Sequence, residues 1–501
     1  MMIFMAEYSC ISDAYQTALA AGGRSCLRRS LSLLADQKFR STSCRQTAVT
    51  MPPTTTTQSI DQAVDAVGMG PFQHGILCAA GLCFMADSME VLLLSFLALV
   101  LQQEWGLTEH ETAFITSSVF VGALMGTLTL GPLGDRIGRR PVMIATATLI
   151  LVFGLLTALA TTLPTLVLCR FLVGFGVGGL TVPFDTLAEC VPTSQRGTQL
   201  LAIEYFWTLG TLLVPVAAYF TLPHWRLFVL ACAIPCLLSL LLCLCWVPES
   251  PRWLLAKGRP DEALEILHTA AQVNGTHLPH ETLLLSEPVV QEAALLQHPH
   301  RRTTLILWAT WAGLAFTYYG TILLVTLVFA DGSDESIFDY GAILTSASAE
   351  LAGTTLALFT MDRWGRVRLQ TSAYLLGGVS VLGLCCSSSR WVRIVWAFLG
   401  RLAFMCGSCT TWISTAEVLT TDVRTTGHAA ANAVARLGGA LSPYLVTQAT
   451  PMVGAILCGV SWMTAWAAAH LPETSGKSMG TAAATVPDDI TMQPPSYGGL
   501  L

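Results

Sequence analysis

Seven charged residues stand inside otherwise apolar stretches of the sequence, and they are the residues best placed to do chemistry. A charge near the middle of a bilayer costs about 2.5–3.5 kcal/mol even on lenient scales, so each one needs a partner or a task. A carboxylate in such a place can bind and release a proton. An arginine can hold a carboxylate through two parallel hydrogen bonds. The seven are Asp87, Glu90, Glu204, Glu350, Arg170, Arg401 and Arg436.

The composition indicates that the elements carrying these residues lie in a membrane. Of 501 residues, 53% are hydrophobic and 12% are charged, whereas soluble domains carry roughly 25% charge. The mean hydropathy is +0.59. These values argue against a soluble enzyme and a disordered scaffold. The net charge of −6, with no basic domain, argues against a nucleic-acid binder. A polytopic membrane protein remains.

Twelve stretches are long and apolar enough for a helix that crosses the hydrocarbon core, which needs about 20 residues. Six precede the polar segment 248–303 and six follow it. We therefore predict an all-α membrane protein with twelve transmembrane helices in two six-helix bundles, 75–247 and 304–471. The stretches are 75–101, 112–133, 142–162, 164–187, 198–221, 226–247, 304–329, 341–361, 369–388, 392–415, 427–449 and 452–471.

The positive residues predict the orientation. Twenty of the 26 Lys and Arg residues fall on one side of the spans, three on the other side and three inside them. Because positive residues gather on the cytoplasmic side, we expect both termini and the central loop 248–303 in the cytoplasm. Residues 1–74 and 472–501 are expected to be disordered cytoplasmic tails. Segment 24–45 also faintly resembles an organelle transit sequence. The acidic residues in and near this segment argue against that interpretation.

Several other patterns carry no function in their context. The 16 cysteines are scattered, mostly within spans, so we predict no structural disulfide. Residues 174–179 spell GxGxxG inside a span, and Asn274-Gly275-Thr276 spells a glycosylation sequon in the cytoplasmic loop. A GxxxxGK[ST] loop is absent from the sequence, which argues against an ATP-driven pump. We expect no enzymatic activity, cofactor or bound metal.

An internal repeat relates the two bundles. Three motifs recur at offsets of 227, 228 and 224 residues, about one six-helix half. Two homologous bundles joined by a loop are the organisation of a transporter that rocks one half against the other. The pairs are Asp135-Arg136-Ile137-Gly138-Arg139-Arg140 with Asp362-Arg363-Trp364-Gly365-Arg366-Val367-Arg368, Ala188-Glu189 with Ala416-Glu417, and Pro248-Glu249-Ser250 with Pro472-Glu473-Thr474.

The first motif, with Gly131 ahead of it, resembles the loop 2–3 signature of the major facilitator superfamily, over roughly residues 75–475. Pro248 to Trp253 resembles the sugar-porter and organic-ion branches. Finer strings look like the synaptic-vesicle-two-related proteins and their nicotinate- and organic-ion-transporting relatives. These strings are Met85 to Glu90, Leu94 to Phe96, Glu204 with Phe206-Trp207, and Thr317 to Gly320. The seventh span lacks the Gln-Gln pair typical of sugar porters, which argues against a hexose substrate.

Two interpretations of the buried acids stay open. Asp87 and Glu90, three residues apart on one helix face, and Glu204 could line a cavity, one of them exchanging a proton. They could instead form fixed pairs with Arg170 that hold the bundle. Arg436 favours an anionic substrate, because the resemblance places an arginine there in organic-anion carriers; its rival role is to pair with Glu350. Tyr318 and Tyr319 are expected to bind the substrate or to anchor span ends.

The repeated loop motif is expected to form a cytoplasmic gate, with Arg136 and Arg139 pairing across the seam between the halves in one state. Arg170 resembles the superfamily's span-4 arginine, whose assigned role is proton transfer or gating. Arg401 starts the matching span 10. The full predicted gating set is Gly131, Asp135, Arg136, Gly138, Arg139, Arg170, Glu189, Asp362, Arg363, Gly365, Arg366, Arg401 and Glu417.

The sequence thus predicts a monomeric, multi-pass carrier for a small organic ion, in the plasma membrane or an internal vesicle membrane. The substrate is expected to be anionic and nicotinate-like, with proton-coupled symport as one mode. An organic cation or a sugar is the alternative within the same fold. A transporter-like protein that binds a ligand or partner as a receptor, without flux, is the alternative from a different class of function.

Overall fold

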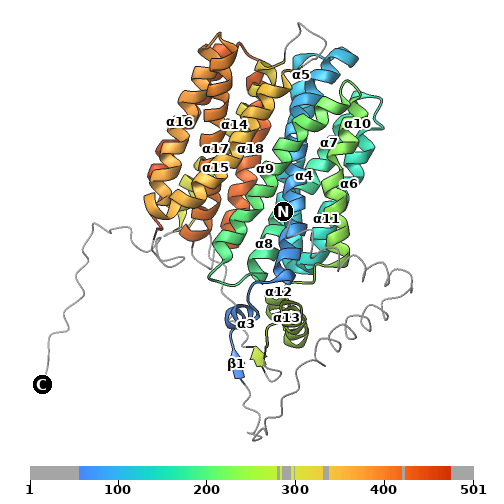
Figure 1. Ribbon diagram of the computed structural model, residues 1–501, viewed down its shortest axis with the longest axis vertical. Helices are drawn as coiled ribbons and strands as arrows, with labels where there is room; N and C mark the ends of the chain where they lie inside the picture. The colour runs from blue at the N-terminus through green and yellow to red at the C-terminus, as the bar shows by residue number, and fades with distance from the viewer. Residues whose placement is uncertain are drawn as a thin grey trace, which may run out of the picture. The chain divides into compact units, whose positions relative to one another are not determined.

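The computed structural model describes residues 56–278, 282–284, 295–297, 300–330, 338–419 and 424–475, all within one unit that begins at Thr55. Long helices dominate this part of the chain (Figure 1). The predicted tails at 1–55 and 476–501 lie outside the described residues. So do parts of the central loop and the side chain of Arg424, one of the positive residues used for orientation.

Six membrane-crossing segments form the first half. The capping box between Thr108 and Glu111 starts the second of them. Pro235 separates the two helices of the sixth, because proline has no N–H to continue the helical ladder. The segments are α4 (Pro71–Trp105), α5 (Glu109–Ile137), α6 (Arg139–Thr157), α7 (Leu163–Val177) continued by η2 (Gly178–Leu180) and α8 (Thr181–Cys190), α9 (Arg196–Thr221), and α10 (Trp225–Cys232) with α11 (Ile234–Cys245).

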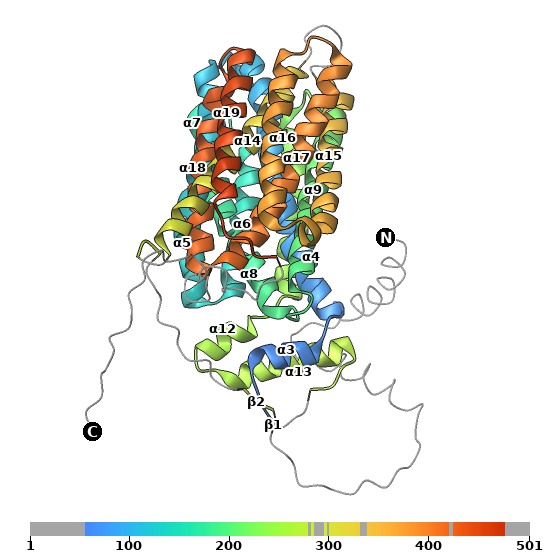
Figure 2. The same ribbon diagram turned by 90° about the vertical axis from the view of Figure 1, so that its left-hand side faces the viewer.

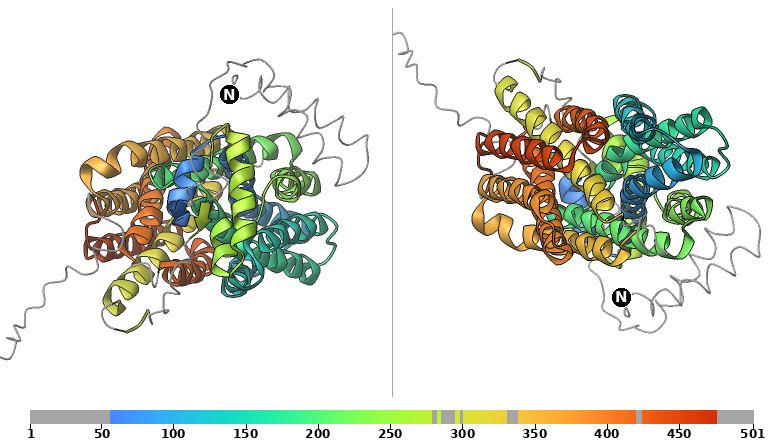
Figure 3. Two further views of the ribbon diagram at one scale, coloured as in Figure 1. Left: turned by 90° about the horizontal axis from the view of Figure 1, so that it is seen from below. Right: turned by 90° about the horizontal axis from the view of Figure 1, so that it is seen from above.

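The second half repeats this arrangement with six unbroken helices. They are α14 (Arg301–Val328), α15 (Tyr340–Trp364), α16 (Arg366–Cys386), α17 (Arg390–Val418), α18 (Arg424–Val446) and α19 (Thr450–Ala469). Seen along the bundle, the blue-to-green helices of the first half and the yellow-to-red helices of the second half lie on opposite sides (Figure 3). The predicted two-bundle, all-α membrane fold is confirmed.

Eleven of these twelve segments are long and apolar enough to cross a membrane by themselves, counted over the described residues. The twelfth, α18, misses this criterion. It carries Asn432 and Arg436, both buried, and packs between α5 and α14. Because protein surrounds its polar face, α18 needs less apolar surface than a helix that faces lipid. The predicted count of twelve is therefore consistent with the structure.

Three short helices cover one end of the first half, which we call the inner end (Figure 2). They are α3 (Ile60–Val67), α12 (Pro251–Ala256) and α13 (Pro260–Asn274). The opposite end, where α4 finishes and α5 begins, is the outer end. Strands β1 (Thr56–Gln58) and β2 (Thr282–Leu284) pair in parallel beside the short helices.

The prediction of a disordered tail over 1–74 is wrong for its last part. Ser59 and Gln62 form a capping box that starts α3, and four apolar residues of this helix are buried. The Asn274 side chain then fixes the chain before α4. It donates to the carbonyls of Val67 and Gly68 and to Gln73 Oε1. Its amide is therefore engaged in anchoring α3, which gives the sequon a structural role.

Asp61 ties α3 to the inner end of the first half. Its carboxylate pairs with Arg196, at 3.1 Å, and with Arg252 of α12. Partial burial opposes ionisation, but the two guanidinium groups outweigh it and lower the pKa of Asp61 below 3.8. A lowered carboxylate pKa adds stability at every pH above the unfolded value. That contribution is lost as the pH falls through the folded value.

We predict that Asp61→Asn loosens α3. Losing a half-exposed carboxylate shared by two arginines costs about 1 kcal/mol, or about a fivefold loss of protection. Hydrogen exchange of residues 60–67 in the purified protein measures it. The effect should be equal at pH 7 and pH 5, because Asp61 is ionised at both.

Asp261→Asn is the matched control, since Asp261 is an exposed acid of α13 that forms no ion pair within the described residues. It should leave the exchange of 60–67 unchanged. Equal exchange in Asp61→Asn and the natural protein at pH 7 would show that the ion cluster does not hold α3.

Candidate functional site

A cavity lies between the two halves, midway along the bundle. It has an empty volume of about 670 Å³ counted to its open edges. Helices α4, α8 and α9 line it from the first half, and α14, α17 and α18 line it from the second half. Five of the seven predicted binding or coupling residues line this central cavity: Asp87, Glu204, Tyr318, Tyr319 and Arg436.

Glu90 does not line the cavity. Its carboxylate lies 2.5 Å from Arg170 Nη1, and the same guanidinium donates twice to Thr157 Oγ1. Arg170 is completely buried and Glu90 nearly so. All three residues belong to the first half. The pair therefore corresponds to the fixed structural pair that the sequence left open as an alternative.

Glu350 forms the matching pair in the second half, with Arg401 at 2.6 Å. Unlike Glu90, it is also held from outside its own half. Thr211 of α9 donates to one carboxylate oxygen at 2.9 Å, and Tyr318 donates to the other at 3.0 Å. Trp207 of α9 in turn donates to the Tyr318 hydroxyl at 2.8 Å. The pair is thus joined to the first half by two hydrogen-bonded paths.

Arg436 lies opposite Asp87 across the cavity. Their closest atoms are 3.9 Å apart, so the two charges offset each other without a direct hydrogen bond. The Nε atom of Arg436 is buried without a hydrogen-bond partner among the described residues. Arg436 therefore pairs with Asp87, not with Glu350 as its rival role required.

Among the seven charged residues predicted inside the spans, charge counting leaves one carboxylate over. Arg170, Arg401 and Arg436 face Glu90, Glu350 and Asp87, whereas Glu204 has no ion pair or side-chain hydrogen bond within the described chain. Glu204 is only 7% exposed and borders the cavity. An unpaired buried carboxylate is costly unless a proton or a cation joins it.

Aromatic rings close the inner end of the cavity. Trp412 of α17 contacts Phe184 of α8, with ring centroids 5.4 Å apart, and Phe84 of α4, at 6.3 Å. Trp311 and His428 pack on the same indole, both at 4.9 Å. Sequence reasoning did not predict this cluster, because a ring inside an apolar span resembles an ordinary packing residue.

Small polar contacts and several ring pairs close the outer end, among them Phe96 of α4 with Phe338 at 4.8 Å and Tyr219 of α9 with Tyr340 of α15 at 5.6 Å between centroids. Ser95 of α4 and Thr326 of α14 are hydrogen-bonded at 2.9 Å. Ser117 of α5 donates to the Ala440 carbonyl of α18 at 2.7 Å. Phe120 and Tyr319 lie with their centroids 4.7 Å apart. The described contacts across the outer seam are therefore weak ones that can separate.

The first copy of the loop motif forms a network inside its own half. Arg139 pairs with Asp135 at 2.7 Å and with Glu189 at 3.2 Å. Glu249 accepts hydrogen bonds from the backbone N–H groups of Arg139 and Arg140, capping α6. Gly138 has φ +117°, and a Cβ there would lie 2.3 Å from the Glu249 carboxylate. Glycine is therefore required at this point of the motif.

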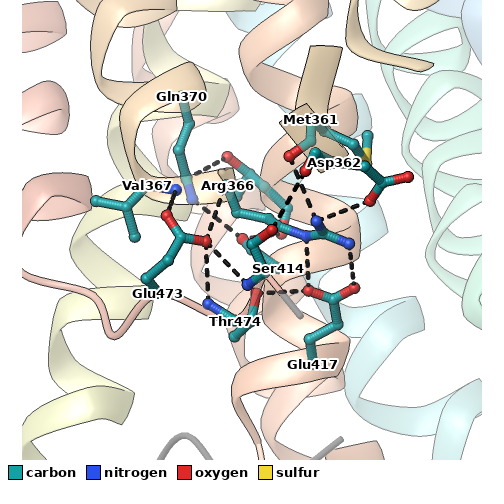
Figure 4. A network of polar contacts seen from close by, with 11 residues as sticks. Met361, Asp362, Arg366, Val367, Gln370, Ser414, Glu417, Glu473 and Thr474 are labelled. Carbon is teal, nitrogen blue, oxygen red and sulfur yellow. Dashed lines mark hydrogen bonds and ion pairs between the residues drawn. The ribbon is translucent and has the colours of Figure 1, made fainter. Parts of the chain in front are cut away.

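The second copy reproduces the network (Figure 4). Arg366 pairs with Asp362 at 2.8 Å and with Glu417 at 3.0 Å. Glu473 accepts from the backbone N–H groups of Arg366 and Val367 at 2.9 and 3.1 Å. Gly365 repeats the positive φ. Partial burial opposes ionisation of Glu473, but these N–H donors outweigh it and lower its pKa.

The gating residues are thus placed in two separate inner networks. No described ion pair joins one copy to the other, and Arg139 pairs inside its own half in this state. Arg136 and Arg363 are exposed. A Cβ on Gly131 would lie 3.8 Å from Thr181, so this glycine is not required by close packing. Gating by the motif stays a prediction.

Sequence reasoning missed Asn432 as a lining residue. The signal was present, because Asn432 stands four residues before Arg436 and therefore on the same helix face. Trp311 also lines the cavity.

Known proteins share the sequence features and the fold of this chain. The family model described as Major Facilitator Superfamily matches residues 76–443, which confirms the resemblance drawn from the motifs. The Synaptic vesicle 2-related protein of Xenopus laevis is 32% identical over 85% of this chain and 83% of its own. The Organic cation/carnitine transporter 7 of Arabidopsis thaliana is 31% identical over 77% and 87%.

The fold is also similar to that of the xylose transporter XylE from E. coli in a partially occluded inward open conformation. The TM-score is 0.66 at 20% identity, covering 81% of this chain and all of that one. At this identity the similarity concerns the fold alone.

The charge count predicts unequal effects of neutralising the buried acids. Glu350→Gln leaves Arg401 buried and unpaired, which costs about 3–5 kcal/mol. Glu204→Gln removes a carboxylate that pairs with nothing, so it should leave stability unchanged or raise it. Thermal unfolding of both variants in detergent measures the difference. A larger loss in Glu204→Gln than in Glu350→Gln would contradict the pairing.

Proposed function

The chain belongs to the major facilitator superfamily, and from that premise we propose that it is a secondary carrier for a small organic ion. The two halves rock about the central cavity, which opens to one side at a time. The observation that carries the proposal is the unpaired Glu204 in a cavity lined by both halves. A carrier needs such a site, whereas a purely structural acid would be paired.

The charge of the cavity favours a cationic group on the substrate. Arg436 is offset by Asp87, which leaves the single negative charge of Glu204. The rings of Trp207, Trp311 and Tyr319 border the same space, and aromatic faces attract organic cations. Two relatives that are 31% and 32% identical to this chain are named as an organic cation/carnitine transporter and an organic cation transporter protein. Together these features shift the preference away from the nicotinate-like anion that Arg436 alone suggested.

An organic anion remains the second candidate. The unpartnered Nε of Arg436 is a free donor at the cavity. A carboxylate that displaced Asp87 from Arg436 would gain a charge-assisted hydrogen bond. Asp87 would then be left to take up a proton, so anion transport in this site implies proton symport.

Proton coupling through Glu204 is part of the proposal. A buried carboxylate without a partner is neutral when empty and charged when a cation lies beside it. Binding of the cation then releases the proton. The cation and the proton therefore cross the membrane in opposite directions. An organic cation is therefore exchanged for protons, whereas an organic anion is carried in the same direction as protons.

We further propose that the inner end faces the cytoplasm. The positive residues place both termini and the α12–α13 loop there. The protein is then a multi-pass carrier of the plasma membrane or an internal vesicle membrane, working as a monomer and without enzymatic activity.

Uptake into proteoliposomes tests the proposal, with tetraethylammonium as the cation and nicotinate as the anion. We expect saturable tetraethylammonium uptake that an outwardly directed proton gradient stimulates and that Glu204→Gln lowers at least tenfold. Arg436→Met should change it less. Glu104→Gln is the control, because Glu104 is an acid outside the cavity that pairs with Arg226 at 3.8 Å.

Nicotinate uptake lost in Arg436→Met but kept in Glu204→Gln would replace the cation candidate by the anion. Binding of either probe, seen as a thermal shift, without any flux would replace the carrier by a receptor. Sugar uptake without uptake of either ion would contradict both charge arguments.

A further inference from the structure

A second pocket opens at the outer end, distinct from the central cavity. Its empty volume is about 810 Å³ counted to its open edges. Helices α4 and α5 line it from the first half. Helices α14 and α18 and the two residues after α18 line it from the second half. We call it the outer pocket.

The closed outer seam separates the two spaces. Ser95, which borders the outer pocket, is hydrogen-bonded to Thr326. Beyond that contact, the ring pair of Phe120 and Tyr319 stands between the seam and the cavity, and only Tyr319 lines the cavity. The two pockets share no lining residue. A ligand in the outer pocket therefore need not touch Glu204 or Arg436.

Three polar side chains of the outer pocket have no hydrogen-bond or ion-pair partner in the described chain: Gln102, Glu109 and Thr116. Thr116 is the most telling, because it is only 3% exposed. A buried hydroxyl usually finds a partner. The neighbouring Thr112 does so by donating to the Thr108 carbonyl at 2.9 Å. The unpartnered Thr116 hydroxyl is therefore available to a ligand.

The remaining lining decides the class of ligand. Leu99, Leu323, Leu327 and Val446 provide an apolar wall from both halves. Glu109 is the single charged residue of the pocket, and no described cation neutralises it. The chemistry that fits is an apolar body with a positive, hydrogen-bonding end.

We propose that the outer pocket is a second ligand site, which binds a protonated amine carried on a small apolar body. The ammonium group lies at Glu109, with the Thr116 hydroxyl and the Gln102 amide as further polar partners. The apolar body lies against the leucines of α4 and α14. The proposal goes beyond the carrier function, because it does not depend on what the central cavity transports.

Occupancy of this site has a mechanical consequence. The walls belong to different halves, and they separate when the outer end opens. A ligand that bridges them stabilises the state with the outer end closed. It therefore inhibits the carrier without competing for the central cavity.

Titration calorimetry on the full chain in detergent tests the proposal, with 4-phenylbutylamine as the probe. We expect saturable binding that weakens at least tenfold in Glu109→Gln and about threefold or more in Thr116→Val. Glu104→Gln is the matched control at the same end, outside the pocket. Glu204→Gln neutralises the central cavity instead. Glu104→Gln should bind the probe as the natural protein does. Glu204→Gln should keep the outer-pocket binding that Glu109→Gln weakens, even if it loses any binding in the central cavity.

Each of the other results overturns the proposal. Loss of binding in Glu204→Gln but not in Glu109→Gln would place the amine in the central cavity. Equal binding by all variants would mean nonspecific partition into detergent. Absence of binding to the natural chain would exclude this class of ligand. Glu109 is exposed, so its substitution leaves the fold intact, and thermal unfolding of each variant verifies this.

Discussion

A charge inside a bilayer must be compensated, and the interior of this protein is organised around that constraint. Three arginines and four carboxylates stand between the halves or within them. Two pairs, Glu90 with Arg170 and Glu350 with Arg401, are direct and fully buried. The third, Asp87 with Arg436, is loose and borders the cavity. The remaining charge, Glu204, borders the central cavity, which is the proposed substrate site.

The two buried pairs have different consequences, although their arginines lie in corresponding helices of the repeat, α7 and α17. Glu90 is satisfied within the first half and can move with it as part of a rigid body. Glu350 also accepts hydrogen bonds from Thr211 and Tyr318. Tyr318 lines the cavity. A substrate that displaces this hydroxyl changes the surroundings of Glu350 and, through Thr211, the seam between the halves. That is a physical route from occupancy to movement.

The sequence was sufficient for the spans, the repeat and the set of buried charges, because each depends on local hydrophobicity or on residue type. It was insufficient for the pairing. Which acid faces Arg436 depends on helices α4 and α18, which are far apart in the chain and meet only across the seam. Helix α3 was missed because eight residues give little periodic signal, although Ser59 and Gln62 spell its capping box. Rings such as Trp412 could not be told from packing residues.

The distribution of bond strengths suits a protein that rocks. Ion pairs and backbone caps, such as Arg366 with Glu417 and Glu473, lie within one half. Across the seam the described contacts are hydroxyl bonds and ring pairs, each worth about 0.5–1.5 kcal/mol, together with the loose Asp87–Arg436 pair at 3.9 Å. Strong contacts inside each half keep it rigid, and weak contacts between the halves let them part. A ligand in either pocket whose binding free energy differs by a few kcal/mol between the two states is then enough to decide which end stays closed.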